Sequence, residues 1–333
     1  MDKMLAITII FGILILCSSV LHSFGRDIIS ERNGLRDGET LVSSGKRFEL
    51  GFFTPAGSSD NRRYVGIWYY KTYPTTVVWV ANGDSPLTET GGDFSVDYGD
   101  LKVLDKSGKL YWHTNLDGPS NPKFHLDAKL MDSGNLVLRN QSKVNIWQSF
   151  EQPTDTFISG MKMHDNLTLT SWASQIDPKP GNFTLKRYQE DVNQLIINRN
   201  GYIAHWRSGV SGEFFHSDEL PYAVHNLLFN KTSSAPSIYN SIRVVINFTG
   251  EIQFWGLDMD ENKWSLKWRN PMEHLTSMLT PLLRSLSLEG RIPLKALHIK
   301  SLTFGGTFKL HKDFHHSPPT PSTPLPPTLK ATS

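Results

Sequence analysis

Short apolar segments that recur about every ten residues, with turn-forming residues between them, constrain the fold of this chain most strongly. Between residues 26 and 155 the segments are rich in β-branched and aromatic residues, and the separators contain Gly, Pro, Asn, Asp or Ser. Strands at this spacing are typical of a β-sandwich, prism or barrel. No amphipathic helix pattern separates them, which disfavours a parallel α/β fold. The predicted strands cover residues 47–53, 64–70, 76–81, 101–104, 109–113, 124–131, 135–139 and 144–149.

The composition excludes several classes of protein. The chain has 333 residues, which is enough for about two domains. Its 34 Lys and Arg against 32 Asp and Glu leave a formal net charge of +2, without the basic excess that a nucleic-acid-binding protein needs. Cys17 is the one cysteine, and it lies near the N-terminus. If that segment is removed, the mature chain has no disulfide framework, no cysteine zinc site and no cysteine nucleophile.

Residues 1–25 have the features of a secretory signal peptide. Lys3 precedes an apolar run over residues 5–17, and small residues follow up to Gly25, after which we predict cleavage. The run is shorter than the roughly 20 residues that a membrane span needs. An uncleaved N-terminal anchor is the alternative, and either outcome delivers the rest of the chain to the lumen. The sequence therefore predicts a secreted, extracellular protein with no membrane span beyond the signal peptide.

Five Asn-x-Ser/Thr sequons follow the signal peptide, and each is a candidate glycosylation site in a secreted chain. Because such triplets also occur by chance, they add to the prediction of secretion without carrying it. The sequons begin at Asn140, Asn166, Asn182, Asn230 and Asn247.

The chain changes character near residue 270. All nine tryptophans lie between Trp68 and Trp268, whereas residues 271–333 hold nine of the nineteen prolines. The same stretch has seven Lys and Arg against three Asp and Glu, a net charge of +4. Proline-dense sequence favours extended conformations and builds no core. We predict a divergent, disordered, Pro-rich tail over residues 271–333.

Short motifs in a fixed order along residues 27–270 resemble two domains of one plant family. The first group resembles the bulb-type lectin domain of S-domain receptor-like kinases, also called G-type lectin receptor kinases. It comprises Leu-Val-Ser-Ser-Gly-Lys-Arg-Phe-Glu-Leu-Gly-Phe-Phe (41–53), Gly-Ile-Trp-Tyr (66–69), Trp-Val-Ala-Asn (79–82), Leu-Met-Asp-Ser-Gly-Asn-Leu-Val-Leu (130–138), Trp-Gln-Ser-Phe (147–150) and Pro-Thr-Asp-Thr (153–156). The second group resembles the S-locus glycoprotein domain. It comprises Leu-Thr-Ser-Trp (169–172), Asp-Pro (177–178) with Gly-Asn-Phe-Thr (181–184), and Trp-Arg-Ser-Gly (206–209).

This resemblance implies an all-β chain, with a bulb-lectin β-prism over residues 26–155 and a second β-rich S-locus glycoprotein-like domain over 156–270. Full-length relatives lie at the plasma membrane and continue into cysteine-rich modules, a membrane span and a kinase. This chain departs from them after residue 270. The resemblance therefore implies a truncated receptor ectodomain, which arises from a truncated or frameshifted gene model or from an alternative ending.

Several residues have predicted structural roles. Gly51 and Gly66 lie within predicted strands, which indicates a bulge or a close backbone approach. Gly108 is expected at positive φ in a hairpin, and Asp155 is expected to bond nearby backbone amides in a turn. Four tryptophans have β-branched or aromatic neighbours and are expected in the core where sheets meet, in preference to stacking on a ligand. They are Trp68, Trp79, Trp112 and Trp147.

The mannose-binding lectins that this chain resembles carry Gln-x-Asp-x-Asn-x-Val-x-Tyr on a strand, with the polar side chains on one face. A degraded first copy keeps Asp132, Asn135 and Val137. Its Asp and Asn are three positions apart instead of two, and Leu130 and Arg139 stand at the Gln and Tyr positions.

A second degraded copy has Asp100 at the Asn position, with Lys102 and Leu104 at the Val and Tyr positions. A third copy, sought around residues 49–53, shows no match. Each lost hydrogen bond costs about 1 kcal/mol, so the degraded carbohydrate sites are predicted to bind a glycan weakly or not at all.

No catalytic motif is present in the sequence. The Gly-rich loop, strand lysine, His-Arg-Asp and Asp-Phe-Gly of a kinase are absent, as are Gly-x-Ser-x-Gly and His-Glu-x-x-His. His311, His315 and His316 lie in the predicted tail, where a solvated cluster is expected in preference to a metal site. We therefore predict no enzyme activity, no cofactor and no metal.

Three functions remain open from the sequence. The first is a secreted, truncated receptor ectodomain that binds a protein or glycan partner, or associates with itself, in extracellular recognition without kinase activity. The second is a soluble mannose-binding lectin. The third is a non-functional product of a truncated receptor-kinase gene.

Overall fold

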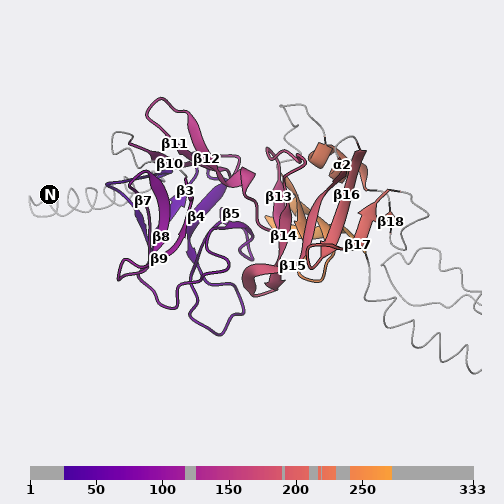
Figure 1. Ribbon diagram of the computed structural model, residues 1–333, viewed down its shortest axis with the longest axis horizontal. Helices are drawn as coiled ribbons and strands as arrows, with labels where there is room; N and C mark the ends of the chain where they lie inside the picture. The colour runs from indigo at the N-terminus through magenta and orange to yellow at the C-terminus, as the bar shows by residue number, and fades with distance from the viewer. Residues whose placement is uncertain are drawn as a thin grey trace, which may run out of the picture. The chain divides into compact units, whose positions relative to one another are not determined.

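Three four-stranded antiparallel sheets form the first part of the molecule (Figure 1). The structure is a computed structural model that describes residues 26–116, 125–189, 192–209, 217–218, 220–229 and 241–271. The first three strands run consecutively along the chain, and each begins a different sheet. They are β1 (Ile28–Ser30), β2 (Leu35–Arg36) and β3 (Thr40–Val42).

The remaining strands of each sheet follow in chain order as an antiparallel meander. The sheet that β3 begins continues through β4 (Phe48–Phe53), β5 (Tyr64–Tyr69) and β6 (Val77–Val80). The sheet of β2 continues through β7 (Asp93–Asp97), β8 (Asp100–Leu104) and β9 (Leu110–His113). The sheet of β1 continues through β10 (Asp127–Leu130), β11 (Leu136–Arg139) and β12 (Asn145–Gln148).

The three sheets repeat one another in detail. In each, the last two strands pair next to an irregularity, and the residue before the irregularity faces a tryptophan. These pairs are Ile67 with Trp79, Val103 with Trp112, and Leu138 with Trp147. The three indoles meet edge to face, with ring centroids 5.8–5.9 Å apart. Such aromatic pairs contribute beyond the area that they bury, so this cluster holds the three sheets together as a prism.

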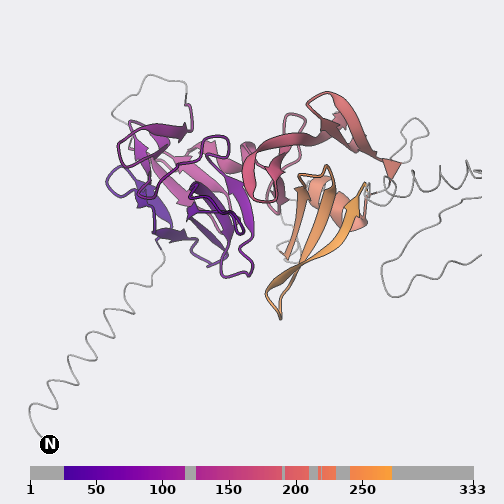
Figure 2. The same ribbon diagram turned by 90° about the horizontal axis from the view of Figure 1, so that it is seen from below.

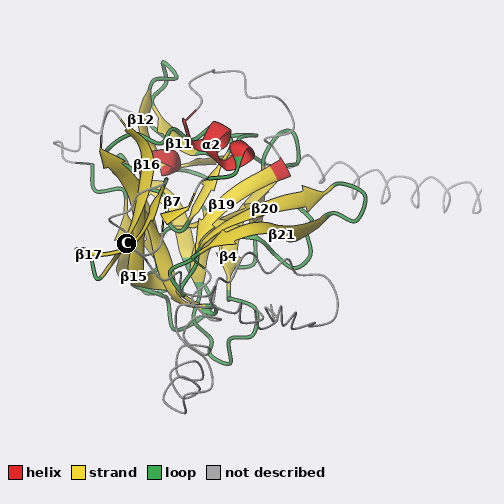
Figure 3. Ribbon diagram, turned by 90° about the vertical axis from the view of Figure 1, so that its right-hand side faces the viewer, coloured by secondary structure: helices red, strands yellow, loops and turns green. Residues whose placement is uncertain are grey.

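Two further sheets and a short helix form the second part of the molecule, and strands dominate throughout (Figure 3). After the 3₁₀ turn η1 (Ser149–Glu151), β13 (Thr156–Ile158) joins β19 (Ile242–Ile246), β20 (Ile252–Asp258) and β21 (Lys263–Asn270). The strands β19, β20 and β21 lie side by side in Figure 2. The other sheet contains β14 (Leu169–Ser174), β15 (Asp177–Gln189), β16 (Val192–Arg199), β17 (Ile203–Ser208) and β18 (Ser217–Asp218).

The sheet β13–β19–β20–β21 buries side chains on both of its faces. Phe157, Val244 and Phe254 face a core that also contains Trp206 and the helix α2 (Tyr222–Phe229). On the opposite face, the adjacent positions join the prism core, with Ile158 and Trp264 buried in it and Trp255 packed against it. Side chains alternate between the faces of a strand, so this one sheet serves both cores.

Most expectations about single residues agree with this fold. Gly108 has φ of +85° in the β8–β9 hairpin. Gly51 faces Gly66 across β4 and β5, and a Cβ at Gly66 would lie 2.9 Å from the Trp79 carbonyl oxygen, which confirms the close backbone approach. Trp79 and Trp147 are buried in the core, and Trp112 packs against it.

Trp68 was expected where sheets meet, and this is wrong. Its neighbour Ile67 is fully buried, so the alternation of the strand directs Trp68 to the outer face. There the Trp68 Nε1 donates to a Glu49 carboxylate oxygen at 2.9 Å.

Four strands of the prism had no predicted counterpart: β1, β2, β3 and β7. The first three span only two or three residues, which is too short for a periodic pattern. In β7, Phe94 and Val96 are buried between polar neighbours, an alternation that identifies a strand. The predicted signal peptide (1–25), Asn230 and the tail beyond residue 271, with His311, His315 and His316, lie outside the described residues.

Candidate carbohydrate-binding positions

The threefold repeat of the prism defines where the carbohydrate motif falls on each sheet. The first degraded copy runs from the end of β10 through the following turn into β11, with Val137 opposite Gln148 of β12. The second lies on β8, with Lys102 opposite His113 of β9. Each pair lies next to the pair that contains the core tryptophan of its sheet, which is Leu138 with Trp147 or Val103 with Trp112. The two copies are therefore structurally equivalent.

Directly before β11, the Asn135 side chain forms hydrogen bonds within the protein. Its Nδ2 donates to Gln148 Oε1 at 2.9 Å, and its Oδ1 accepts from Ser149 Oγ and from the Phe150 amide, both at 3.2 Å. The residue is 8% exposed. These bonds employ the amide groups with which an asparagine would hold a sugar hydroxyl.

The other members of this copy are also engaged by the protein. Asp132 is exposed, and its Oδ1 accepts from the Gly45 amide at 2.5 Å, which joins two turns. Val137 is buried. Arg139, at the tyrosine position, forms an ion pair from Nε to Asp127 Oδ1 at 2.5 Å. Its cationic end is thereby tied to the neighbouring strand β10.

On β8, Asp100 is likewise bonded within its sheet. One carboxylate oxygen contacts His113 Nδ1 at 2.7 Å, and the other accepts from the Thr114 hydroxyl. Lys102 Nζ lies 2.8 Å from Asp97 Oδ2 and 5.6 Å from the ring centroid of Tyr98, whose side chain is 74% exposed. The polar groups of Asp100 and Lys102 are therefore each paired with other residues of the same sheet or its turns.

The third copy does not lie around residues 49–53. The register places its Val-equivalent at Gly66, which faces Val80, and its other positions at Tyr64 and Trp68 on β5. The Phe53 ring covers Gly66 so closely that a Cβ there would lie 2.6 Å from it. The ring of Phe53 also lies 5.8 Å from Tyr64 and 6.2 Å from Trp68, centroid to centroid. An aromatic cluster thus occupies this position.

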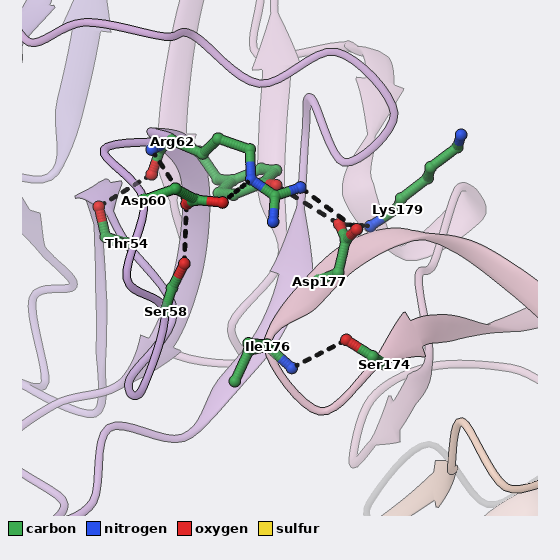
Figure 4. A network of polar contacts seen from close by, with 9 residues as sticks. Thr54, Ser58, Asp60, Arg62, Ser174, Ile176, Asp177 and Lys179 are labelled. Carbon is green, nitrogen blue, oxygen red and sulfur yellow. Dashed lines mark hydrogen bonds and ion pairs between the residues drawn. The ribbon is translucent and has the colours of Figure 1, made fainter.

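Tyr64 also contacts the second part of the molecule. Its side chain is fully buried, and its hydroxyl lies 3.5 Å from Asp177 Oδ1 of β15. Burial raises the pKa of Tyr64 to about 12, so the hydroxyl stays protonated. The same Asp177 carboxylate pairs with Arg62 Nη1 at 3.2 Å and accepts from the Lys179 amide at 3.1 Å (Figure 4).

Four of the five sequons lie among the described residues. Asn166 and Asn182 are exposed. Asn140 forms the turn between β11 and β12, where its Oδ1 accepts from the Val144 amide at 3.0 Å. Asn247 starts the turn between β19 and β20, and its Nδ2 donates to Thr249 Oγ1 at 3.2 Å.

The sequence did not reveal the residues that contact the motif positions: Gln148, His113 and Phe53. The signal was available for the first two, because each directly follows the core tryptophan of its sheet. The part of the chain that the structure describes contains no group of three or more His, Cys, Asp or Glu suited to a metal ion. Within that same part, no helix has the length and hydropathy to cross a membrane.

Residues 76–175 match the D-mannose binding lectin family. The match runs from the start of β6, through the sheets of β7–β9 and β10–β12, to the end of β14. This chain contains a bulb-type lectin domain.

The relatives of this lectin-domain chain are plant proteins. A G-type lectin S-receptor-like serine/threonine-protein kinase of Arabidopsis thaliana is 46% identical over 251 residues, covering 71% of this chain and 29% of the relative. S-locus-specific glycoprotein S6 of Brassica oleracea is 32% identical over 292 residues, covering 81% of this chain and 65% of the relative. The chain thus spans under a third of the matched kinase and about two thirds of the glycoprotein. The described region is a receptor-like lectin ectodomain.

Among solved structures, the chain is similar to the mannose-specific agglutinin of snowdrop bulbs, with 17% identity and a TM-score of 0.26 over 36% of this chain and 93% of that one. It is also similar to a Marasmius oreades lectin, with 17% identity and a TM-score of 0.28 over 37% of this chain and 90% of that one.

Proposed function

We propose that this lectin ectodomain acts in extracellular recognition through protein contacts and does not bind free mannose at the lectin motif. One observation carries the proposal: at the three equivalent positions of the prism, the protein itself engages the groups that a sugar would need. Asn135 and Asp100 are hydrogen-bonded within their sheets, and an aromatic ring covers Gly66. Binding a sugar there would first break these internal bonds, and single hydrogen bonds to a sugar regain little.

The exposed side chains support a protein partner or self-association. Tyr73, Tyr98, Tyr202 and Met259 are between 72% and 86% exposed. Tyrosine and methionine are enriched in protein–protein interfaces, where they anchor contacts of about 800 Å² per partner. The relatives named as receptors also fit a role in recognition. Secretion, glycosylation and the absence of kinase activity belong to the same proposal.

Retention of the full-length chain on immobilised mannose tests it. We expect no retention above that on a mannose-free matrix, together with capture of a protein partner or of a second copy from extracellular fluid. Saturable retention that free mannose competes away would establish the soluble-lectin alternative instead.

A pair of variants would then locate such a mannose site. Asp132→Ala removes an exposed carboxylate of the motif, whereas Asp84→Ala removes an exposed carboxylate of another turn of the prism. Loss of mannose retention in the first variant only would place binding at the degraded motif. Asn135→Ala is a poor choice, because it removes the donor to Gln148 and the acceptor of the Ser149 hydroxyl and the Phe150 amide.

A further inference from the structure

Two turns of the prism close with the same hydrogen bonds. Between β11 and β12, the Asn140 amide donates to the Val144 carbonyl at 3.1 Å, and the Val144 amide donates to Asn140 Oδ1 at 3.0 Å. Between β8 and β9, the Asp105 amide donates to the Lys109 carbonyl at 3.0 Å, and the Lys109 amide donates to Asp105 Oδ1 at 3.0 Å. Asn140 is therefore the structural equivalent of Asp105, and Val144 is the equivalent of Lys109.

The side chains at and after these equivalent positions differ in polarity. On β9, the exposed Leu110 lies between Lys109 and Tyr111, and the Lys109 Nζ lies 4.9 Å from the centroid of the Tyr111 ring. At the start of β12, Val144 and Ile146 are 55% and 44% exposed. The turn before β9 thus carries two charged side chains where the turn before β12 carries an amide and an apolar side chain.

Strand β12 is the last strand of its sheet, and within the described residues it pairs with β11 alone. An edge strand with exposed apolar side chains is prone to pair with another chain, and lysines at the edge commonly prevent this. Lys109 gives β9 such a charge. The lysine before β12, Lys143, has its Nζ 3.5 Å from Asp127 Oδ2 of β10. Its charge is therefore directed back across the sheet and away from the free edge.

The Asn140 side chain offers an attachment point beside this edge. Asn140, Gln141 and Ser142 form a sequon. The bond from the Val144 amide holds Oδ1, whereas Nδ2, on the same side-chain carbon, makes no hydrogen bond within the described residues. An N-linked glycan attaches to this nitrogen and is bulky and solubilising. Its first sugar would therefore begin next to Val144.

We propose, building on the proposed secretion and glycosylation, that a glycan on Asn140 covers Val144 and Ile146 and keeps the β12 edge from pairing with a second copy of the chain. The glycan protects β12 as the Lys109 charge protects β9. Without it, the same edge of two chains can meet about a twofold axis, which is the commonest symmetry of homodimers. The surface open to a recognition partner then excludes this edge.

Analytical ultracentrifugation of the full-length chain expressed in plant cells tests the proposal. Ser142→Ala removes the sequon and leaves the hydrogen bonds of Asn140 intact. Thr168→Ala is the matched control, because it removes the sequon of Asn166, whose exposed neighbours in the chain are polar. Ser142→Ala should lower the dissociation constant of self-association at least tenfold, as expected from burying two half-exposed aliphatic side chains. Thr168→Ala should leave the constant unchanged.

A second substitution locates the effect. Val144→Lys in the Ser142→Ala chain gives β12 the residue that β9 has at this position, and it should restore the dissociation constant of the glycosylated chain. Equal self-association of the Ser142→Ala and wild-type chains would overturn the proposal, as would self-association that Val144→Lys does not reverse.

Peptide mass spectrometry of the wild-type chain separates this proposal from the one on which it rests. We expect a glycan on Asn140. An unglycosylated Asn140 in a chain that carries a glycan on Asn166 would overturn the covering of β12 and leave the proposed secretion standing. A chain without any glycan would overturn both.

Discussion

The prism and the sheet β13–β19–β20–β21 bury their side chains in two different ways. Each prism sheet packs one face into the core around the three indoles, and its other face carries polar and aromatic side chains, of which Tyr64 is buried beside Asp177 of β15. The later sheet buries both faces, with Phe157 in one core and Ile158 in the other. A sheet with one free face can lose a ligand site and keep its fold, because the core does not depend on the outer residues. A sheet buried on both faces has few residues that can change without disturbing a core.

The largest difference in the free energy of unfolding should appear between alanine variants of two tryptophans. Trp264→Ala in the two-faced sheet removes a ring that packs against Tyr69 and Arg243, and it should lower the free energy of unfolding by about 3–5 kcal/mol. Trp68→Ala on an outer face of the prism should cost about half as much or less, because the ring is only partly buried. Chemical denaturation of both variants measures the ratio. Equal losses would show that the outer face of β5 is as closely packed as the shared sheet.

Gly66→Ala tests whether the third motif position is sealed. The new methyl group would meet the Phe53 ring and the Trp79 carbonyl oxygen, and we expect a loss of about 1–3 kcal/mol. Adding Phe53→Leu should recover part of this loss, since the side chain gives way more easily than the backbone. The coupling is measured as a double-mutant cycle. Full tolerance of Gly66→Ala would mean that this outer face is open after all.

Asp177→Asn weakens the polar contact between Tyr64, Arg62 and β15, which is partly solvent-exposed. We expect a loss of about 0.5 kcal/mol that shrinks at high salt. The exposed pair of Lys106 and Glu89 is the control, and Glu89→Gln should have no measurable effect on the melting temperature. If Asp177→Asn lowered the free energy of unfolding several times more than this, the contact would be a main stabilising interaction between the prism and the second part.

The smallest effect on stability should come from the sequons. Asn166→Gln and Asn182→Gln change exposed side chains, so each should remove one glycan while the melting temperature stays nearly constant. Electrophoretic mobility before and after enzymatic deglycosylation of plant-expressed protein counts the glycans. A chain whose mobility does not change on deglycosylation would contradict the proposed secretion.

Local patterns in the sequence were sufficient for the class of fold and for many of its strands. The alternation around Leu101 and Val103 and the turn at Gly108 depend on neighbours in the chain, and both are as predicted. The order of the short motifs identified the lectin domain, because the motifs too are patterns of neighbouring residues in the chain. Strands of two or three residues escaped prediction, because their conformation is stabilised by the partner strand and not by their own pattern.

For the candidate site, too, some features follow from the sequence and others from the tertiary structure. The sequence by itself determined which residue types stand at Asp132, Asn135 and Asp100 and how they are spaced, and from these alone we predicted a degraded sugar motif. Only the tertiary structure decided what occupies those positions. The Asn135 amide is bound by Gln148, the third copy lies at Gly66 under Phe53, and Arg243 is enclosed by two indoles from other strands. Hydrogen bonds, burial and stacking between distant segments depend on strand register, which is fixed when the sheets pack around a common core.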